Sequence, residues 1–282
     1  MNPIKIFTDS TSDLPRQWVE QYEIGIVPLY TVFGNESLRD GVDIIPEQLF
    51  KRVSREGRLP KTAAPSPADF IQYFSPYIDQ GMDILYISLS SDLSSTYQNG
   101  RVAGGEFPEG RVHVVDSKNL SCGIGLLVMK AVKAVRNGLG IQEVVQVLEE
   151  IRPRIDTEFV IDTLEYLYKG GRCSGMQNLI GSLLKIRPVI KVIDGKMTPA
   201  YKVRGKREKA IDQMLSNALS QKDNMDLELV IVVHALAEED ALELQKRLQE
   251  QTGAEVALAT AGCVICSHCG PQTIGIIYAK KS

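Results

Sequence analysis

Short apolar runs alternate with longer amphipathic stretches through the first half of the chain. Four runs have the length of buried strands, at residues 3–7, 25–33, 83–88 and 111–115. Stretches with helical spacing lie between and after them, at residues 46–56, 67–80, 123–137 and 141–152. Strands that alternate with helices predict crossover connections and a parallel sheet. Pro15 suits the first turn of one further helix, for which Ser12 or Asp13 is the expected cap.

The pattern changes after the Arg-Pro-Arg sequence at 152–154. Further strands are expected at residues 157–161, 186–193, 196–203, 227–233, 255–259 and 273–279, with helices at 176–184, 206–221 and 237–252. Asp194-Gly195 between two β-rich runs predicts a hairpin. We therefore expect an α/β protein with two domains. An N-terminal parallel-sheet domain would span residues 1–153, and a C-terminal domain with a mixed sheet and helices on one face would span 154–282.

Hydroxyl-rich loops follow three of the predicted strands in the first half. They read TDSTSD, SLSSDLSST and DSKNLS. In an open parallel sheet such loops share the carboxyl edge, where ligands bind. Serine, threonine and aspartate are also ordinary turn and cap residues, so each loop alone has a structural explanation. Together they predict a polar site at this edge.

Residues 159–174 read FVIDTLEYLYKGGRCS and form the best candidate for an anion site. Gly170 and Gly171 allow the backbone to approach a ligand closely. Arg172 follows them at once, and its guanidinium matches a carboxylate or a phosphate.

Composition narrows the class of protein. The 282 residues carry a formal charge of −3, which argues against a nucleic-acid binder, and no apolar run approaches the length of a membrane span. The chain turns polar directly after its first residues, and its five cysteines are an odd number, so we expect a soluble cytoplasmic protein with reduced thiols. A phosphate-binding loop, a complete dinucleotide fingerprint and the GxSxG and HExxH motifs are all absent.

Two further clusters of residues have more than one possible role. Cys263, Cys266 and Cys269 surround His268 in a segment expected to be a glycine–proline loop, and they can be read as metal ligands or as packed thiols. The basic run at 202–209 includes Arg204 and opens a predicted helix, where cations oppose the helix dipole. Such a placement indicates a docking surface for an acidic partner or for phosphates.

Taken in order, the motifs resemble those of the DegV family of bacterial lipid-binding proteins. The matching pieces cover essentially the whole chain and read FTDSTSDLP, TAAPSPADF, ISLSSDLSSTYQNG, VVDSKNLSCGIG, TLEYLYKGGRCS, LLKIRPVIKVIDGKM with KVRGKREKA, and SHCGPQTIGIIY. The resemblance implies two α/β domains with a long-chain fatty acid between them. It implies that Thr62, Ser94, Arg172 and His268 hold the carboxylate.

The resemblance also implies a partner. Members of this family serve as the fatty-acid-binding subunit of a fatty acid kinase, whose separate kinase subunit supplies ATP and forms acyl-phosphate. This chain would then have no turnover alone, no cofactor beyond its lipid ligand, and transient membrane contact, with Arg204 on the kinase-docking surface. Ala63 and Ala64 depart from the polar residues that are common in the family, which leaves the chain-length preference open. A metal- or redox-sensing protein and a stand-alone enzyme acting on an acidic metabolite are the alternatives.

Overall fold

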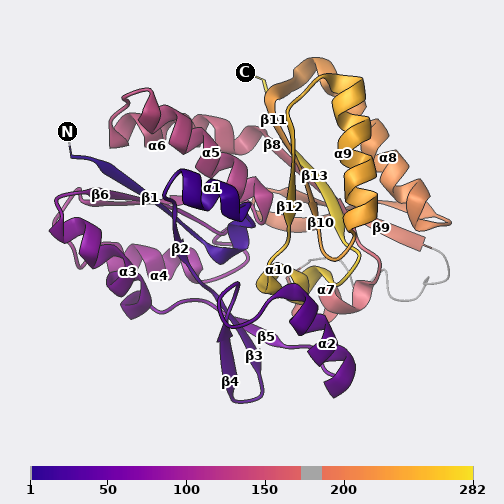
Figure 1. Ribbon diagram of the computed structural model, residues 1–282, viewed down its shortest axis with the longest axis horizontal. Coiled ribbons are helices and arrows are strands. Elements are labelled where there is room, and N and C mark those ends of the chain that lie inside the picture. The colour runs from indigo at the N-terminus through magenta and orange to yellow at the C-terminus, as the bar shows by residue number, and fades with distance from the viewer. Residues whose placement is uncertain (1, 173–185, 282) are drawn as a thin grey trace.

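A computed structural model describes residues 2–172 and 186–281, and its first half is built around a parallel sheet (Figure 1). The sheet has the order β2-β1-β6-β7 and every pairing in it is parallel. Its strands are β1 (Ile4–Asp9), β2 (Gly25–Val27), β6 (Asp83–Ser88) and β7 (Val112–Asp116). The parallel sheet expected from the alternating pattern is therefore confirmed.

The helices of this half end where the sequence places glycines and caps. They are the short 3-10 turn η1 (Ser10–Ser12) and the helices α1 (Arg16–Gln21), α2 (Pro46–Glu56), α3 (Pro67–Asp79), α4 (Thr96–Gly104), α5 (Cys122–Arg136) and α6 (Ile141–Ile151). Gly57 ends α2 with a φ of 65°, a conformation that glycine adopts without strain. Ser66 and Asp69 form the expected capping box of α3. The helix α4 was not expected.

Residues 25–33 do not form the single strand that was expected. The run divides into β2 and β3 (Tyr30–Phe33), and β3 belongs to a separate antiparallel sheet of order β4-β3-β5. The partners of β3 are β4 (Glu36–Arg39) and β5 (Lys61–Ala63). Pro28 lies at the break, and because proline has no N–H it cannot continue a ladder of hydrogen bonds.

The second half forms a mixed sheet of order β10-β9-β8-β13-β11-β12. Its strands are β8 (Ile155–Val160), β9 (Ile186–Ile193), β10 (Lys196–Arg204), β11 (Met225–His234), β12 (Val256–Thr260) and β13 (Ile274–Lys280). The β9–β10 hairpin turns at Asp194-Gly195 as expected, and only the β11–β12 pairing in this sheet is parallel. The helices here are α7 (Leu164–Gly170), α8 (Arg207–Ser220), α9 (Glu238–Thr252) and α10 (Cys263–Cys269), with 3-10 turns η2 (Arg152–Arg154) and η4 (Lys222–Asn224).

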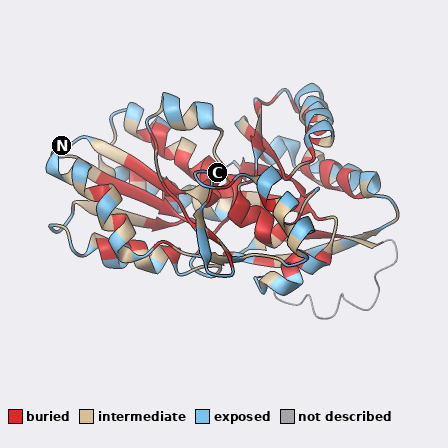
Figure 2. Cartoon of the chain, turned by 60° about the horizontal axis from the view of Figure 1, so that its bottom comes forward, coloured by how far each residue is buried: buried red, intermediate tan, exposed pale blue. Residues whose placement is uncertain are grey.

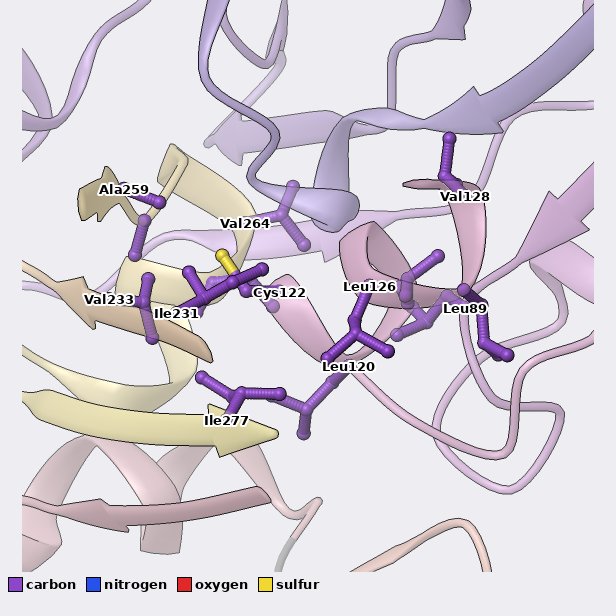
Figure 3. Close-up of a cluster of buried hydrophobic side chains, with 14 of the residues drawn as sticks. Leu89, Leu120, Cys122, Leu126, Val128, Ile231, Val233, Ala259, Val264 and Ile277 are labelled. Carbon is purple, nitrogen blue, oxygen red and sulfur yellow. The ribbon is translucent and has the colours of Figure 1, made fainter. Parts of the chain in front are cut away.

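The long helices of this half, α8 and α9, lie on one face of the mixed sheet as expected, and the opposite face is covered by α5 of the first half. Val230 and Val232 of β11 pack with residues of α8 and α9, whereas Ile231 and Val233 point to the other face. There they join Leu126 of α5 in one apolar cluster (Figure 3). The buried residues thus run without a break from one sheet to the other (Figure 2).

One apolar cluster contains residues of both halves, which is relevant to the expected domain boundary. Each half also has an apolar cluster of its own, centred on Phe70 and Phe74 in the first and on α8 and α9 in the second. Division at residues 153 and 154 stays a prediction. The helix expected at 176–184 lies outside the described residues. Among those that are described, no helix combines the length and apolar character that crossing a membrane requires.

Candidate functional site

A cavity of about 270 Å³ lies where α10, the loop after β6 and the three-stranded sheet β4-β3-β5, here called the small sheet, meet. Thr62, Ser94, Arg172 and His268 all line it, although they are far apart in the sequence. The other lining residues are mostly apolar: Leu29, Ala63, Ala64, Leu89, Leu93, Ser95, Leu120, Met197, Val264, Ile265 and Cys269. The structure therefore brings the four predicted site residues to one place.

Thr62 and His268 are directly bonded. The Thr62 Oγ1 lies 2.9 Å from His268 Nε2, so β5 and the last turn of α10 meet at this point. His268 Nδ1 is buried and has no hydrogen-bond partner among the residues that the structure describes. A neutral imidazole therefore carries its proton better on Nε2, where Thr62 Oγ1 accepts it. The hydroxyl proton of Thr62 is then free to donate to a ligand.

Close packing of α7 keeps His268 in this orientation. A Cβ atom added to Gly170 would lie 2.4 Å from His268 Nδ1, so no side chain fits at this position. Burial and, to a smaller extent, the charge of Arg172 together lower the pKa of His268 to about 4. The imidazole is thus neutral at physiological pH.

The neutral state of His268 predicts a pH dependence of stability. Its pKa falls from 6.5 to about 4 on folding, so the folded protein binds fewer protons than the unfolded chain between these values. Above pH 6.5 this group does not change the free energy of unfolding. As the pH falls from 6.5 toward 4, the free energy of unfolding decreases, and the complete decrease is roughly 3 kcal/mol. We expect His268→Gln to remove this loss from the unfolding free energy measured by denaturant titration. His113→Gln, on β7 outside the cavity, is the control; an identical pH profile for His268→Gln and the wild type would contradict the assignment.

Ser94 is held by its own loop. Its Oγ lies 2.8 Å from Thr96 Oγ1, and it accepts a bond of 3.3 Å from the Thr96 backbone N–H. The same loop is anchored to β1, because Asp9 accepts a bond from the Leu89 backbone N–H at 2.9 Å. One of the predicted hydroxyl-rich loops thus reaches the cavity with an oriented side chain.

Arg172 is the sole formal charge among the described residues that line the cavity. It follows Gly171, which ends α7 with a φ of 66°. Its Nη1 donates to the Gly170 carbonyl at 2.7 Å, and the side chain is otherwise exposed. The guanidinium therefore gives the cavity a positive end next to two hydroxyls and an imidazole.

A smaller cavity of about 20 Å³ lies beside the first. Leu120, Ile265 and Cys269 line both cavities. The other lining residues of the smaller one include Phe159 of β8, Val233 of β11 and Ile277 of β13. The two cavities thus share apolar wall residues, and the smaller one borders the mixed sheet. The sequence analysis did not identify these lining residues, since their irregular spacing resembles that of any core.

The cysteines behave as packed thiols. Cys263 Sγ donates to the Ile44 carbonyl at 3.4 Å and Cys266 Sγ to the Ala261 carbonyl at 3.4 Å. Burial raises the pKa of both thiols. Within the part of the chain that the structure describes, no group of three cysteine, histidine or acidic residues is placed to hold a metal ion. Cys173 lies outside that part. The helix α10 also replaces the loop expected around His268.

Arg204 lies apart from the cavity. It is exposed at the end of β10, next to the start of α8 at Arg207. Its assignment to a docking surface stays a prediction.

Fold and site define an α/β protein with an apolar cavity that ends in a cationic, hydroxyl-rich pocket. The chain belongs to the DegV family, whose model, described as an uncharacterised protein of the DegV family, matches residues 3–281. A solved structure described as fatty acid binding of a DegV family protein from Thermus thermophilus is similar, with a TM-score of 0.91 and 33% identity over 99% of this chain and 100% of that one.

Two other relatives have informative names. A fatty acid-binding protein of Thermotoga maritima is 34% identical over 96% of both chains. The solved structure of a stearic acid-binding protein from Eubacterium ventriosum is 26% identical, with a TM-score of 0.89 over 100% of this chain and 99% of that one.

Proposed function

We propose that this protein binds a long-chain fatty acid, with the carboxylate at Thr62, Ser94, Arg172 and His268. The observation that carries the proposal is the lining of the cavity, which combines one described charge, a few hydroxyls and an imidazole with a majority of apolar side chains. A fatty acid has the same division between an anionic head and an apolar chain. The names of the two fatty-acid-binding relatives support the same ligand.

The polar end has enough donors for a carboxylate. Thr62 can donate its hydroxyl proton because it accepts from His268, and Arg172 contributes a guanidinium with several N–H groups. A hydrogen bond to a charged group contributes about 1.5–3 kcal/mol. The apolar chain adds roughly 0.8 kcal/mol for each methylene that leaves water. Both contributions favour a long-chain acid over a short carboxylate or a neutral lipid.

Lipid extraction of the purified protein followed by mass spectrometry tests the proposal. We expect stoichiometric long-chain fatty acid, or its uptake after delipidation. A delipidated protein that takes up no fatty acid would contradict the proposal, whatever else is bound.

The protein would then present its acid to a separate kinase subunit for ATP-dependent phosphorylation to acyl-phosphate. The sequence contains no phosphate-binding loop, which suits a subunit that holds the substrate while a partner binds ATP. A closed apolar site also protects a reactive acyl-phosphate from water. The same proposal places the protein in the cytoplasm, in transient contact with membranes, and the buried free thiols fit a reducing compartment.

Arg204→Ala tests the docking surface. Because Arg204 lies outside the cavity, we expect the affinity for fatty acid to stay within about twofold and acyl-phosphate formation with the kinase subunit to fall about tenfold or more. The readouts are equilibrium binding and the initial rate of acyl-phosphate formation. Arg55→Ala is the matched control, since the Arg55 side chain is 76% exposed. Equal rates for the wild type and Arg204→Ala would remove Arg204 from the docking surface.

A further inference from the structure

Two buried aspartates from the first half of the chain hold the start of α10. Asp13 Oδ1 accepts from the Gly262 backbone N–H at 2.8 Å. Asp40 Oδ1 accepts from the Cys263 N–H at 2.7 Å, and its Oδ2 from the Val264 N–H at 3.3 Å. The two side chains thus satisfy three N–H groups that a helix start leaves without partners.

Burying two carboxylates here is costly, so the arrangement needs an explanation. Asp13 is 6% exposed and Asp40 3%, and burial raises the pKa of each, while the N–H bonds act in the opposite direction. Gly262 fits the pair closely, since a Cβ atom there would lie 3.0 Å from Asp40 Oδ2 and 3.2 Å from Asp13 Oδ1. Asp13 also accepts a hydrogen bond from Ser121, at the entrance to α5.

The small sheet contacts α10 at both of its ends. Asp40 follows β4 directly and bonds the first turn of α10, while Thr62 on β5 bonds His268 in the last turn. Both strands pair with β3, so one rigid unit fixes the two ends of the helix. Figure 1 shows α10 lying between this sheet and the mixed sheet.

Asp40 does not line the cavity, yet its carboxylate bonds the first N–H groups of α10. We propose that Asp40, assisted by Asp13, is a positioning residue that holds His268 against Thr62 and thereby tunes the affinity for the ligand carboxylate. The inference rests on the proposed function, since it assumes that the bonded Thr62–His268 pair receives that carboxylate. Fixing a short helix at its start is needed because a seven-residue helix has little stability of its own.

Asp40→Asn is the first test, since the amide keeps the shape but presents a donor to at least one N–H. The measurement compares the affinities for palmitate and for palmityl alcohol, which has the same chain and no carboxylate. We expect the affinity for palmitate to fall about tenfold, while the affinity for the alcohol stays within about twofold. Asp13→Asn is expected to behave in the same way. Asp43→Asn is the matched control, because Asp43 is exposed on the same loop and bonds only Arg39 among the contacts described.

Each outcome of this comparison either supports or overturns the positioning role of Asp40. An unchanged affinity of Asp40→Asn for palmitate, or equal losses for both ligands, would overturn the positioning role, because general loosening affects both ligands alike. A wild type that shows no preference for palmitate over the alcohol would instead overturn the carboxylate site, and this inference with it.

Amide exchange in the wild type covers the case in which neither variant folds. Palmitate, and not palmityl alcohol, should then slow exchange of the Cys263 and Val264 N–H groups that bond Asp40, since coupling between two sites is reciprocal. Equal exchange with the two ligands would overturn the proposal.

Discussion

Replacing Thr62 by valine should lower the affinity for a long-chain fatty acid by about 10- to 100-fold. Valine keeps the branched shape that suits β5 but removes the hydroxyl that bonds His268 Nε2 at 2.9 Å. The loss is large because two groups are affected. The carboxylate loses a donor, and the imidazole loses the hydrogen bond that its ring makes to Thr62, while Nδ1 has no partner among residues 2–172 and 186–281.

Thr31→Val provides a closely matched control for this result. Thr31 lies directly opposite Thr62 in the β3–β5 pairing. It is fully buried, and its hydroxyl has no partner within the described part of the chain. Valine at this position removes an unpaired polar group, so fatty-acid affinity should not change and thermal stability should not fall. Affinities come from competition with a fluorescent fatty-acid analogue. Equal losses in the two variants would show that the small sheet, rather than the Thr62 hydroxyl, is what the ligand requires.

Local sequence signals predicted the parts of the fold that they control directly. The expected range of α2, its end at Gly57 and the hairpin at Asp194-Gly195 agree with the structure because each depends on residues within a few positions. The division of residues 25–33 was missed, since two strands of different sheets give the same apolar run as one. Pro28 was the available indication.

The helix α10 could not be predicted in this way. Its first N–H groups bond Asp13 and Asp40, which are 249 and 223 residues away from their partners. Ser12 or Asp13 was expected to cap the helix that begins near Pro15, but Pro15 is the N-cap of α1 and Asp13 bonds Gly262 instead. Short-range rules assign such an aspartate to the nearest helix, whereas the folded chain uses it in the other half.

The candidate site was likewise predictable from the sequence only in part. Ser94 stands in a hydroxyl-rich loop and Arg172 follows a glycine turn, so their surroundings were noticeable in the sequence. Thr62 lies on β5 and His268 in α10, and both were assigned through the family resemblance. The apolar walls were not visible, because Leu120, Ile265 and Cys269 look like ordinary core positions until the fold leaves space between them.

The second large effect on fatty-acid affinity is expected from Cys269→Phe, because Cys269 belongs to those apolar walls. Cys269 lines both cavities, so we expect the acyl chain to pass it, and a phenylalanine in its place would occupy that space. We expect the affinity for palmitate to fall by about 100-fold or more, since several methylenes would lose their apolar surroundings at roughly 0.8 kcal/mol each. Octanoate, whose chain is shorter, should lose much less. Competition binding with the two acids measures the difference directly.

Cys269→Ala separates the added volume from the lost thiol. Alanine leaves that space open, so palmitate should bind to this variant about as well as to the wild type, provided that the thiol only packs. Unchanged palmitate binding by Cys269→Phe would contradict the proposed path of the acyl chain. If Cys269→Ala lost binding as severely as Cys269→Phe, the thiol itself would be required, and the redox- or metal-sensing alternative would regain support over a purely packed cysteine. Thermal unfolding of both variants is the necessary companion measurement, because overpacking alone costs about 1–3 kcal/mol of stability.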